Sequence, residues 1–303
     1  TIYPCNDRSV VVKVLTKNGL IGWGETYGTV APKIIAEFFN DIIIEYIRNK
    51  NILEIEKIHD GLYQLMRVRG YWGGFWLDAL AALDIALWDI KAQTEKKSIS
   101  KLISDKPTKR IEAYVSGLPG KSKKDRLKIA ENWVNQGYNK LKIKLESLVK
   151  SPFSVRTIKN EFKSLRKLFG DKIEIAIDMH WINDVNQSKI ICNELEEFNP
   201  WFIEAPCQPE DIEGLKHICD GSNIKIAVGE EWRTYYDAYL RRKTGISIMQ
   251  PEIGHTGITE FIRINQLANE NNLTIIPHAT ISIGIFLKAS LQISASLGIK
   301  CHE

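Results

Sequence analysis

The sequence has few cysteines, no long apolar run and no large excess of charge of one sign. Its five cysteines form no CxxC pair, and their odd number excludes a complete disulfide framework, so we expect reduced thiols in a cytoplasmic protein. No stretch approaches about 18 consecutive apolar residues, so we expect no membrane-spanning segment. The 41 basic and 37 acidic side chains are scattered and give a net charge of +4, which argues against a nucleic-acid partner.

The length and composition are those of a globular protein with room for two domains. The chain has 303 residues, 44% of them apolar and 26% charged, and about 150 residues per domain is usual. In the first part, SVVVKVLT and LIGWGE flank Asn18-Gly19, which predicts a β-hairpin with a tight turn. Helical spacing of apolar residues predicts three helices, near 31–48, 52–66 and 77–93. We therefore expect an α+β first domain over residues 1–110.

From Ile111 onward, short apolar or β-branched runs alternate with amphipathic segments. The eight runs lie at 111–115, 141–145, 173–178, 201–204, 224–230, 246–250, 273–278 and 299–303. Eight strands separated by helices are typical of a closed parallel α/β barrel, here over 111–303. An open doubly wound sheet has the same alternation, but the residues at the strand ends favour the barrel.

Three successive strands of this predicted barrel end in carboxylates. Asp178, Glu204 and Glu230 are evenly spaced, because 204 − 178 and 230 − 204 are both 26. The carboxyl ends of barrel strands converge on one mouth, and like charges that close require a neutralising cation. Oxygen ligands favour Mg²⁺. His180 and His278, also at strand ends, leave zinc as an alternative, although three carboxylates form a hard site.

Nitrogen bases flank this carboxylate set. Lys142 and Lys144 alternate in one strand, so both point to the same side, either into the barrel or outward between helices. Inside the barrel, each would lower the pKa of the other and leave an uncharged amine as a base. His278 follows the seventh strand, and Glu252 is placed to accept its ring N–H. A lysine and a histidine beside a metal suit removal of the proton next to a carboxylate, which gives an enediolate.

Motifs over almost the whole chain resemble the enolase superfamily, in its mandelate racemase-like subgroup. They are GLIGWGE (19–25), DIALWDIKA (84–92), GYNKLKIK (137–144), AIDMH (176–180), WFIEAP (201–206), AVGEE (227–231), QPEIGHTGITE (250–260) and IIPHA (275–279). The resemblance implies a capping domain on a (β/α)7β barrel, with Mg²⁺ held by the three carboxylates. It also implies that Lys144 is the lysine base or acid with Lys142 as its electrostatic partner. His278 and its carboxylate neighbour would form the dyad on the other face.

Further roles follow from the same resemblance. The pattern Asp178-x-His180 is similar to the acid-sugar dehydratases of the galactonate type, in which this histidine acts at the leaving hydroxyl. Glu303 matches a residue that hydrogen-bonds the substrate carboxylate or its enediolate. The first domain would hang over the barrel mouth and choose the substrate, with candidate contacts at Tyr27, Arg67, Arg69, Tyr71 and Trp72.

The sequence also departs from the family pattern in two places. Ala205 follows Glu204 where a second glutamate is usual, so one supporting carboxylate is missing. Glu252 stands where aspartate is usual, and the extra methylene is expected to shift or weaken its support of His278. The lysine pair together with the Asp-x-His pattern supplies more acid–base groups than a simple dehydratase needs.

These observations predict a Mg²⁺-dependent dehydratase that converts an aldonate or aldarate into a 2-keto-3-deoxy acid. A racemase or epimerase shares the first step, and ring-opening of a sugar lactone by a cycloisomerase is a third enzymatic reading. A non-catalytic barrel that binds a metabolite is the alternative from another class. Relatives usually assemble into dimers or octamers, so the resemblance also implies a homo-oligomer.

Overall fold

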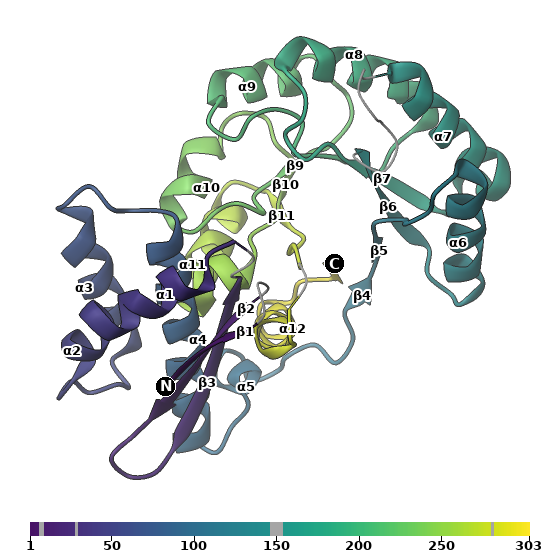
Figure 1. The fold of residues 1–303 in the computed structure, drawn as a ribbon. Helices are drawn as coiled ribbons and strands as arrows, with labels where there is room; N and C mark the ends of the chain where they lie inside the picture. The colour runs from purple at the N-terminus through teal and green to yellow at the C-terminus, as the bar shows by residue number, and fades with distance from the viewer. Residues whose placement is uncertain (6–8, 28–29, 146–153, 280–281) are drawn as a thin grey trace.

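The computed structural model describes residues 1–303 except 6–8, 28–29, 146–153 and 280–281, and it has two parts (Figure 1). The first part begins with an antiparallel sheet of β1 (Ile2–Cys5), β2 (Ser9–Leu15) and β3 (Ile21–Tyr27). Helices then follow: α1 (Pro32–Phe38), the π-helical segment η1 (Phe39–Ile43), α2 (Ile44–Ile47), α3 (Ile55–Arg67), α4 (Phe75–Thr94) and α5 (Ile99–Ile103). The α+β character of this part is as predicted.

The β2–β3 hairpin packs closely on helix α4. Gly19 in the turn has φ +87°, a conformation that glycine adopts without strain, and Leu15 pairs with Ile21. On β3, a Cβ at Gly24 would lie 1.8 Å from the carbonyl oxygen of Ala82 in α4. The glycines of the GLIGWGE motif therefore allow the sheet and the buried helix to approach each other.

The second part is a closed barrel of parallel strands. One sheet has the order β11-β10-β9-β8-β7-β6-β5, and β12 pairs with β4, which directly precedes β5. The backbone N–H of Glu303 donates to the carbonyl of Pro277 at 3.4 Å, which joins the last two strands. The ring is therefore closed, and the open-sheet alternative is excluded.

The predicted apolar runs form the barrel strands. They are β4 (Glu112–Ala113), β5 (Val115–Ser116), β6 (Lys140–Lys144), β7 (Glu174–Asp178), β8 (Ile203–Glu204), β9 (Ile226–Val228), β10 (Ile248–Met249), β11 (Thr274–Ile275) and β12 (Cys301–His302). The connecting helices are α6 (Lys123–Asn135), α7 (Val155–Phe169), α8 (Val185–Leu195), α9 (Ile212–Asp220), α10 (Tyr235–Arg241), α11 (Ile253–Glu270) and α12 (Ile285–Leu297). In Figure 1, helices α6 to α9 lie on the outer side of the curved sheet.

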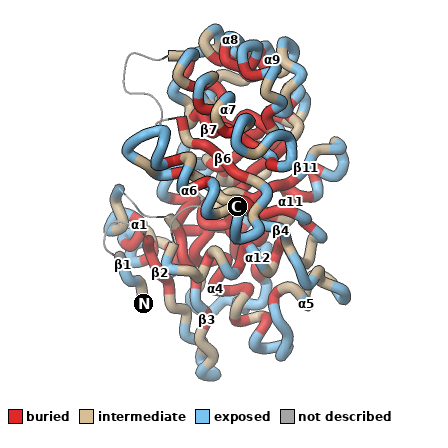
Figure 2. Tube along the Cα trace, turned by 90° about the vertical axis from the view of Figure 1, so that its right-hand side faces the viewer, coloured by how far each residue is buried: buried red, intermediate tan, exposed pale blue. Residues whose placement is uncertain are grey.

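Two buried carboxylates connect the first part to the barrel. Asp84 of α4 accepts hydrogen bonds from the backbone N–H groups of Ile258 (2.7 Å) and Thr259 (2.9 Å) in α11. Glu25 at the end of β3 accepts from the backbone of Ile285 (2.8 Å) at the start of α12. Ile285 begins α12, and Ile258 and Thr259 follow Gly257, whose φ of +66° interrupts α11, so these bonds satisfy donors that the start of a helical segment leaves free. Buried residues accordingly run without a break from α4 into β6 and β7 (Figure 2).

Among the residues that the structure describes, no helix has the length and apolar character needed to cross a bilayer.

Candidate active site

The three carboxylates expected to bind a metal lie at neighbouring strand ends and are buried. Asp178 and Glu204 are partners across β7 and β8, and Glu230 follows β9. Burial raises the pKa of Asp178 and of Glu204, and in each case further carboxylates add to the rise. Carboxylates that repel one another in a buried place stay ionised together only if a positive charge is near.

Lys142 supplies one such charge. Its Nζ donates to both oxygens of Glu204, at 2.7 and 2.9 Å, and lies 2.9 Å from Oε1 of Glu303. Burial opposes the charge of Lys142, but Glu204 and Glu303 raise its pKa well above the ordinary value. The expected lowering of the Lys142 pKa by Lys144 is therefore wrong, because the carboxylates outweigh the second lysine. Both lysines do line the barrel cavity, which excludes the outward arrangement.

The donor set fits a hard divalent cation. Carboxylate oxygens are the preferred ligands of such ions. Glu204, Glu230 and His278 each offer a ligand atom, and these atoms lie within 4.8 Å of one another. Asp178 is not a member of this group, but it is the sheet partner of Glu204 at the same strand ends. These residues could therefore hold a cation at the mouth of the barrel.

His278 lies between two carboxylates. Its Nδ1 is 2.6 Å from Oε2 of Glu252 and its Nε2 is 2.8 Å from Oε2 of Glu230. Burial opposes the charge of the ring, but Glu303, Glu230 and Glu252 raise the pKa of His278 well above its usual value. The predicted contact between His278 and Glu252 is present at hydrogen-bond distance.

Lys144 and His180 lie on the other flank of the carboxylates. Lys144 is the sheet partner of Asp178, and both Lys144 and His180 line the cavity. The backbone N–H of His180 donates to Oδ1 of Asp178 at 2.8 Å. His180 and Trp181 have φ values of +45° and +55°, a left-handed conformation that is costly for residues with a side chain. Such strain occurs mainly where a functional group must be presented in one direction.

A cavity of about 670 Å³ gathers most of the predicted site residues. Its wall includes Tyr27, Lys142, Lys144, Asp178, His180, Glu230, Glu252, His278 and Glu303. Burial opposes ionisation of Glu303, but Lys142 and His278 lower its pKa to about 2, so this carboxylate is charged. Glu204 does not line the cavity, but it accepts a hydrogen bond from Lys142, which does.

Four predicted substrate contacts do not line this cavity. They are exposed residues at the end of α3 and in the following loop: Arg67, Arg69, Tyr71 and Trp72. Arg67 donates from Nε to Gln64 at 2.9 Å, and Arg69 donates to the carbonyl of Leu65, so both guanidinium groups fold back along α3. The structure does not show these residues at the cavity, so their contact with a substrate stays a prediction.

The structure adds the wall residues Asp78 and Arg233, which the sequence reasoning missed, and places in the wall His255, whose position beyond the sixth strand makes it a candidate for the mouth. Asp78 comes from the first turn of α4, Arg233 from the segment after β9, and His255 from the start of α11. The available signals were a charge inside the apolar run of α4 and the histidine of the EIGHTG segment. Glu231 also lies in the wall, and its Oε2 is buried with no hydrogen-bond partner in the described structure.

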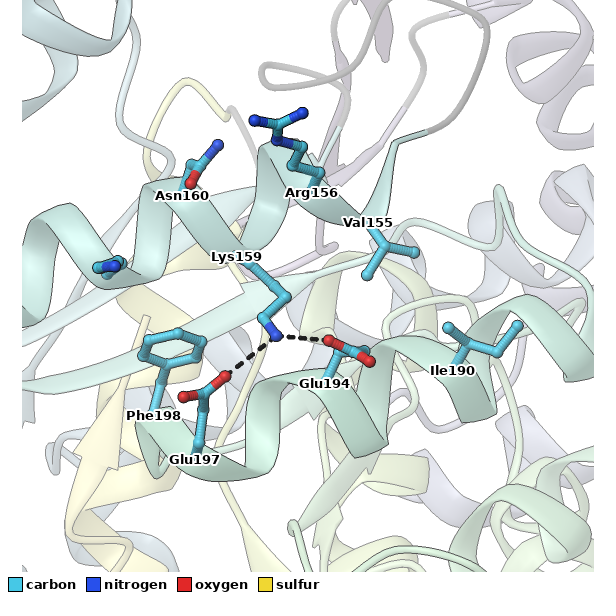
Figure 3. A pocket seen from close by; sticks show the side chains of 9 residues that line it. Val155, Arg156, Lys159, Asn160, Ile190, Glu194, Glu197 and Phe198 are labelled. Carbon is cyan, nitrogen blue, oxygen red and sulfur yellow. Dashed lines mark hydrogen bonds and ion pairs between the residues drawn. The ribbon is translucent and has the colours of Figure 1, made fainter.

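A second hollow, of about 550 Å³, lies between α7 and α8 on the outer surface (Figure 3). At its centre, Lys159 forms ion pairs with Glu194 and, at 3.0 Å, with Glu197. Lys159 is engaged by these two carboxylates, and the described lining contains no histidine or cysteine. The barrel mouth is therefore the candidate active site.

Comparison with known families agrees with this geometry. The family "Mandelate racemase / muconate lactonizing enzyme, N-terminal domain" matches residues 5–104, and "Enolase C-terminal domain-like" matches residues 125–303. The fold and the site define a capped (β/α)7β-barrel enzyme with acid–base groups around buried carboxylates. The chain belongs to the enolase superfamily, in its mandelate racemase and muconate lactonizing enzyme group.

Solved structures of this superfamily superpose on the whole chain. A member from Agrobacterium tumefaciens is 44% identical with a TM-score of 0.92, over 97% of this chain and 75% of that one. A presumed isomerase from Sinorhizobium meliloti is 42% identical, with the same TM-score of 0.92 and the same coverage of 97% and 75%. A presumed galactarate dehydratase from Agrobacterium radiobacter, bound to sodium and L-malate, is 24% identical with a TM-score of 0.88, over 100% of this chain and 79% of that one. This last structure shares the fold.

Proposed function

We propose that the protein is a Mg²⁺-dependent dehydratase of an acid sugar, an aldonate or aldarate, and that it forms a 2-keto-3-deoxy acid. The observation that carries the proposal is the presence of three proton-transfer groups in one cavity wall, namely Lys144, His180 and His278. Removal of the C2 proton needs one base, and departure of the C3 hydroxyl needs an acid. A racemase needs two such groups, one to remove the C2 proton and one to return it, so a third group favours a dehydratase.

Asp178, Glu204 and Glu230 would hold the metal. When bound, Mg²⁺ would stabilise the negative charge that develops on the substrate carboxylate as the C2 proton leaves. Lys142 stays charged beside Glu204 and Glu303 and adds a fixed positive charge at the same place. Glu303 accepts a hydrogen bond from the backbone of Ala279 at 3.2 Å, which orients it toward the cavity.

The proton transfers fall to this chain's own side chains. His278 or Lys144 takes the C2 proton, and the Glu252 contact holds the His278 ring in one orientation. His180 or His278 gives a proton to the C3 hydroxyl, which leaves as water. The resulting enol takes up a proton at C3 and releases the proton of its C2 hydroxyl, which gives the 2-keto-3-deoxy acid.

An isomerase is the second candidate, and one observation favours it. Lys144 on β6 and His278 after β11 are separated by four strands of the sheet, so two bases flank the cavity from different sides. Removal of a proton by one and its return by the other would invert C2. Opening of a sugar lactone starts with the same proton removal.

A product screen separates these activities. Acid sugars and their lactones are incubated with enzyme and Mg²⁺ in D₂O, and products are followed by proton NMR. Dehydration predicts a 2-keto-3-deoxy product, whereas deuterium at C2 without loss of water would favour an epimerase. If Lys144→Ala and His278→Asn leave every property unchanged, the protein is a non-catalytic binding barrel.

A further inference from the structure

A second histidine–carboxylate pair lies in the wall of the same cavity. Nδ1 of His255 is 2.7 Å from Oδ1 of Asp78, which is buried in the first turn of α4. Arg233 binds the same carboxylate through Nε (2.9 Å) and Nη2 (3.2 Å). All three side chains line the cavity, so the first part of the chain and two barrel loops meet there.

The charges and donors of this cluster decide what His255 can bind. Arg233 neutralises Asp78, and its Nη1 donates to the carbonyl of Glu231 at 2.9 Å, so each of its three nitrogens is engaged. A carboxylate only accepts, so Nδ1 of His255 carries the proton that is shared with Asp78. In a neutral ring, Nε2 then presents a lone pair.

Nε2, on the other side of the His255 ring, has no hydrogen-bond partner in the part of the chain that the structure describes. The ring of Tyr27 packs edge-on against the His255 ring at 5.3 Å between centroids. The ring is therefore held by Asp78 and Tyr27 while one acceptor atom stays available. Glu231, with its buried and unpartnered Oε2, adds a further carboxyl group to this wall.

We propose that His255 is a specificity-determining residue that accepts a hydrogen bond from a hydroxyl at the end of the acid sugar remote from the reacting carboxylate. Asp78 is its positioning residue. The inference rests on the proposed function and adds to it one hydroxyl contact that distinguishes among acid sugars.

The test compares galactonate and 6-deoxygalactonate as substrates of the wild-type enzyme and of His255→Leu. The variant is expected to lose about tenfold in kcat/KM for galactonate through a higher KM with kcat nearly unchanged, as loss of one neutral hydrogen bond would give. It should act on 6-deoxygalactonate like the wild type. His255→Gln, which keeps an acceptor, should recover part of the loss, and the exposed His217→Leu serves as a matched control.

Equal losses on galactonate and its 6-deoxy analogue would overturn the proposal. Asp78→Asn should raise KM for galactonate more than for the deoxy acid, provided that circular dichroism shows a folded protein. If the wild type exchanges the C2 proton without losing water, the dehydratase proposal fails. The role of His255 is then tested by comparing the exchange rates of galactonate and 6-deoxygalactonate in the wild type and in His255→Leu. If neither acid is turned over, calorimetry measures the binding of galactonate and 6-deoxygalactonate instead. The wild type should bind galactonate more tightly than the deoxy acid, and His255→Leu should bind both equally. Equal affinities in the wild type, or an unchanged preference in the variant, would contradict the proposal.

Discussion

Nζ of Lys142 lies 2.7 Å from Oε1 and 2.9 Å from Oε2 of Glu204, and both side chains are almost fully buried. This pair joins the second and fourth strands of the barrel, and Glu204 is itself a candidate metal ligand. Removal of one member of a buried ion pair leaves an uncompensated charge.

The first prediction concerns this pair. Lys142→Met should lower the free energy of unfolding by about 3–5 kcal/mol, because Glu204 and Glu303 lose their shared cation. Lys140→Met is the matched control on the same strand: Lys140 pairs with the half-exposed Glu112, so its loss should cost about 1 kcal/mol or less. Urea unfolding followed by circular dichroism measures both. Equal decreases in the free energy of unfolding for the two variants would contradict the role of Lys142 as the shared counter-ion of Glu204 and Glu303.

The second prediction concerns the support of His278. Glu252→Gln keeps a hydrogen-bonding oxygen but removes the negative charge that stabilises a protonated ring. Exchange of the C2 proton should slow by about 10²–10⁴-fold, the range that a positioned acid–base group contributes. Glu270→Gln changes an exposed glutamate at the end of the same helix and should have no effect. Full activity of the Glu252 variant would show that His278 acts without its partner.

The third prediction is a pH dependence of stability at the junction between α3 and α11. His59 lies 3.2 Å from Asp60 and 3.9 Å from Glu260. Burial opposes its charge, but Asp60, Asp84 and Glu260 raise the pKa of His59 above 6.5. Bonding to His59 and Arg263 lowers the pKa of Asp60 below 3.8.

The sign of the effect follows from these two shifts. The raised pKa of His59 contributes stability that is fully present below pH 6.5 and is lost as pH rises through the higher folded-state value. The lowered pKa of Asp60 contributes stability that is present above pH 3.8 and is lost as pH falls below it. The stability advantage of the wild type over His59→Gln should therefore be greatest between these values. Thermal unfolding across pH measures it, and a pH-independent difference would refute the assignment.

The fourth prediction tests the close packing of β3 on α4. A Cβ at Gly24 would lie 1.8 Å from a backbone oxygen, which cannot move without shifting the helix. Gly24→Ala should lower the free energy of unfolding by at least about 1–3 kcal/mol, the usual range for overpacking. Gly73→Ala is the control, because an added Cβ there meets nothing within 4 Å. Similar unfolding curves for both variants would argue against this packing.

Much of the fold could be predicted because most barrel strands are short apolar runs followed by an ionisable residue. The same feature indicated Asp178, Glu204, Glu230 and His278, since barrel strands end at one mouth whatever their separation in sequence. The helix expected over 31–48 was predicted less well. It is interrupted by the π-helical segment Phe39–Ile43, a change of hydrogen bonding that apolar spacing does not reveal.

Interactions between distant segments limited the remaining predictions. Strand β1 forms by pairing with β2, and its four residues carry little pattern of their own. The pKa of Lys142 depends on Glu204 and Glu303, which the sequence places far away. Asp78, Arg233 and His255 meet only because α4 packs against the barrel mouth. Their joint role could not be read from any one segment.

The central claim is that three strand-end carboxylates hold a divalent cation beside groups that move the C2 proton. Proton NMR of an acid sugar in D₂O tests it most directly, with the wild type in Mg²⁺, the wild type in EDTA, and Glu204→Gln in Mg²⁺. We predict loss of the C2 proton signal in the first sample alone, with all three proteins folded. Undiminished loss of that signal in EDTA or in the Glu204 variant would contradict the account.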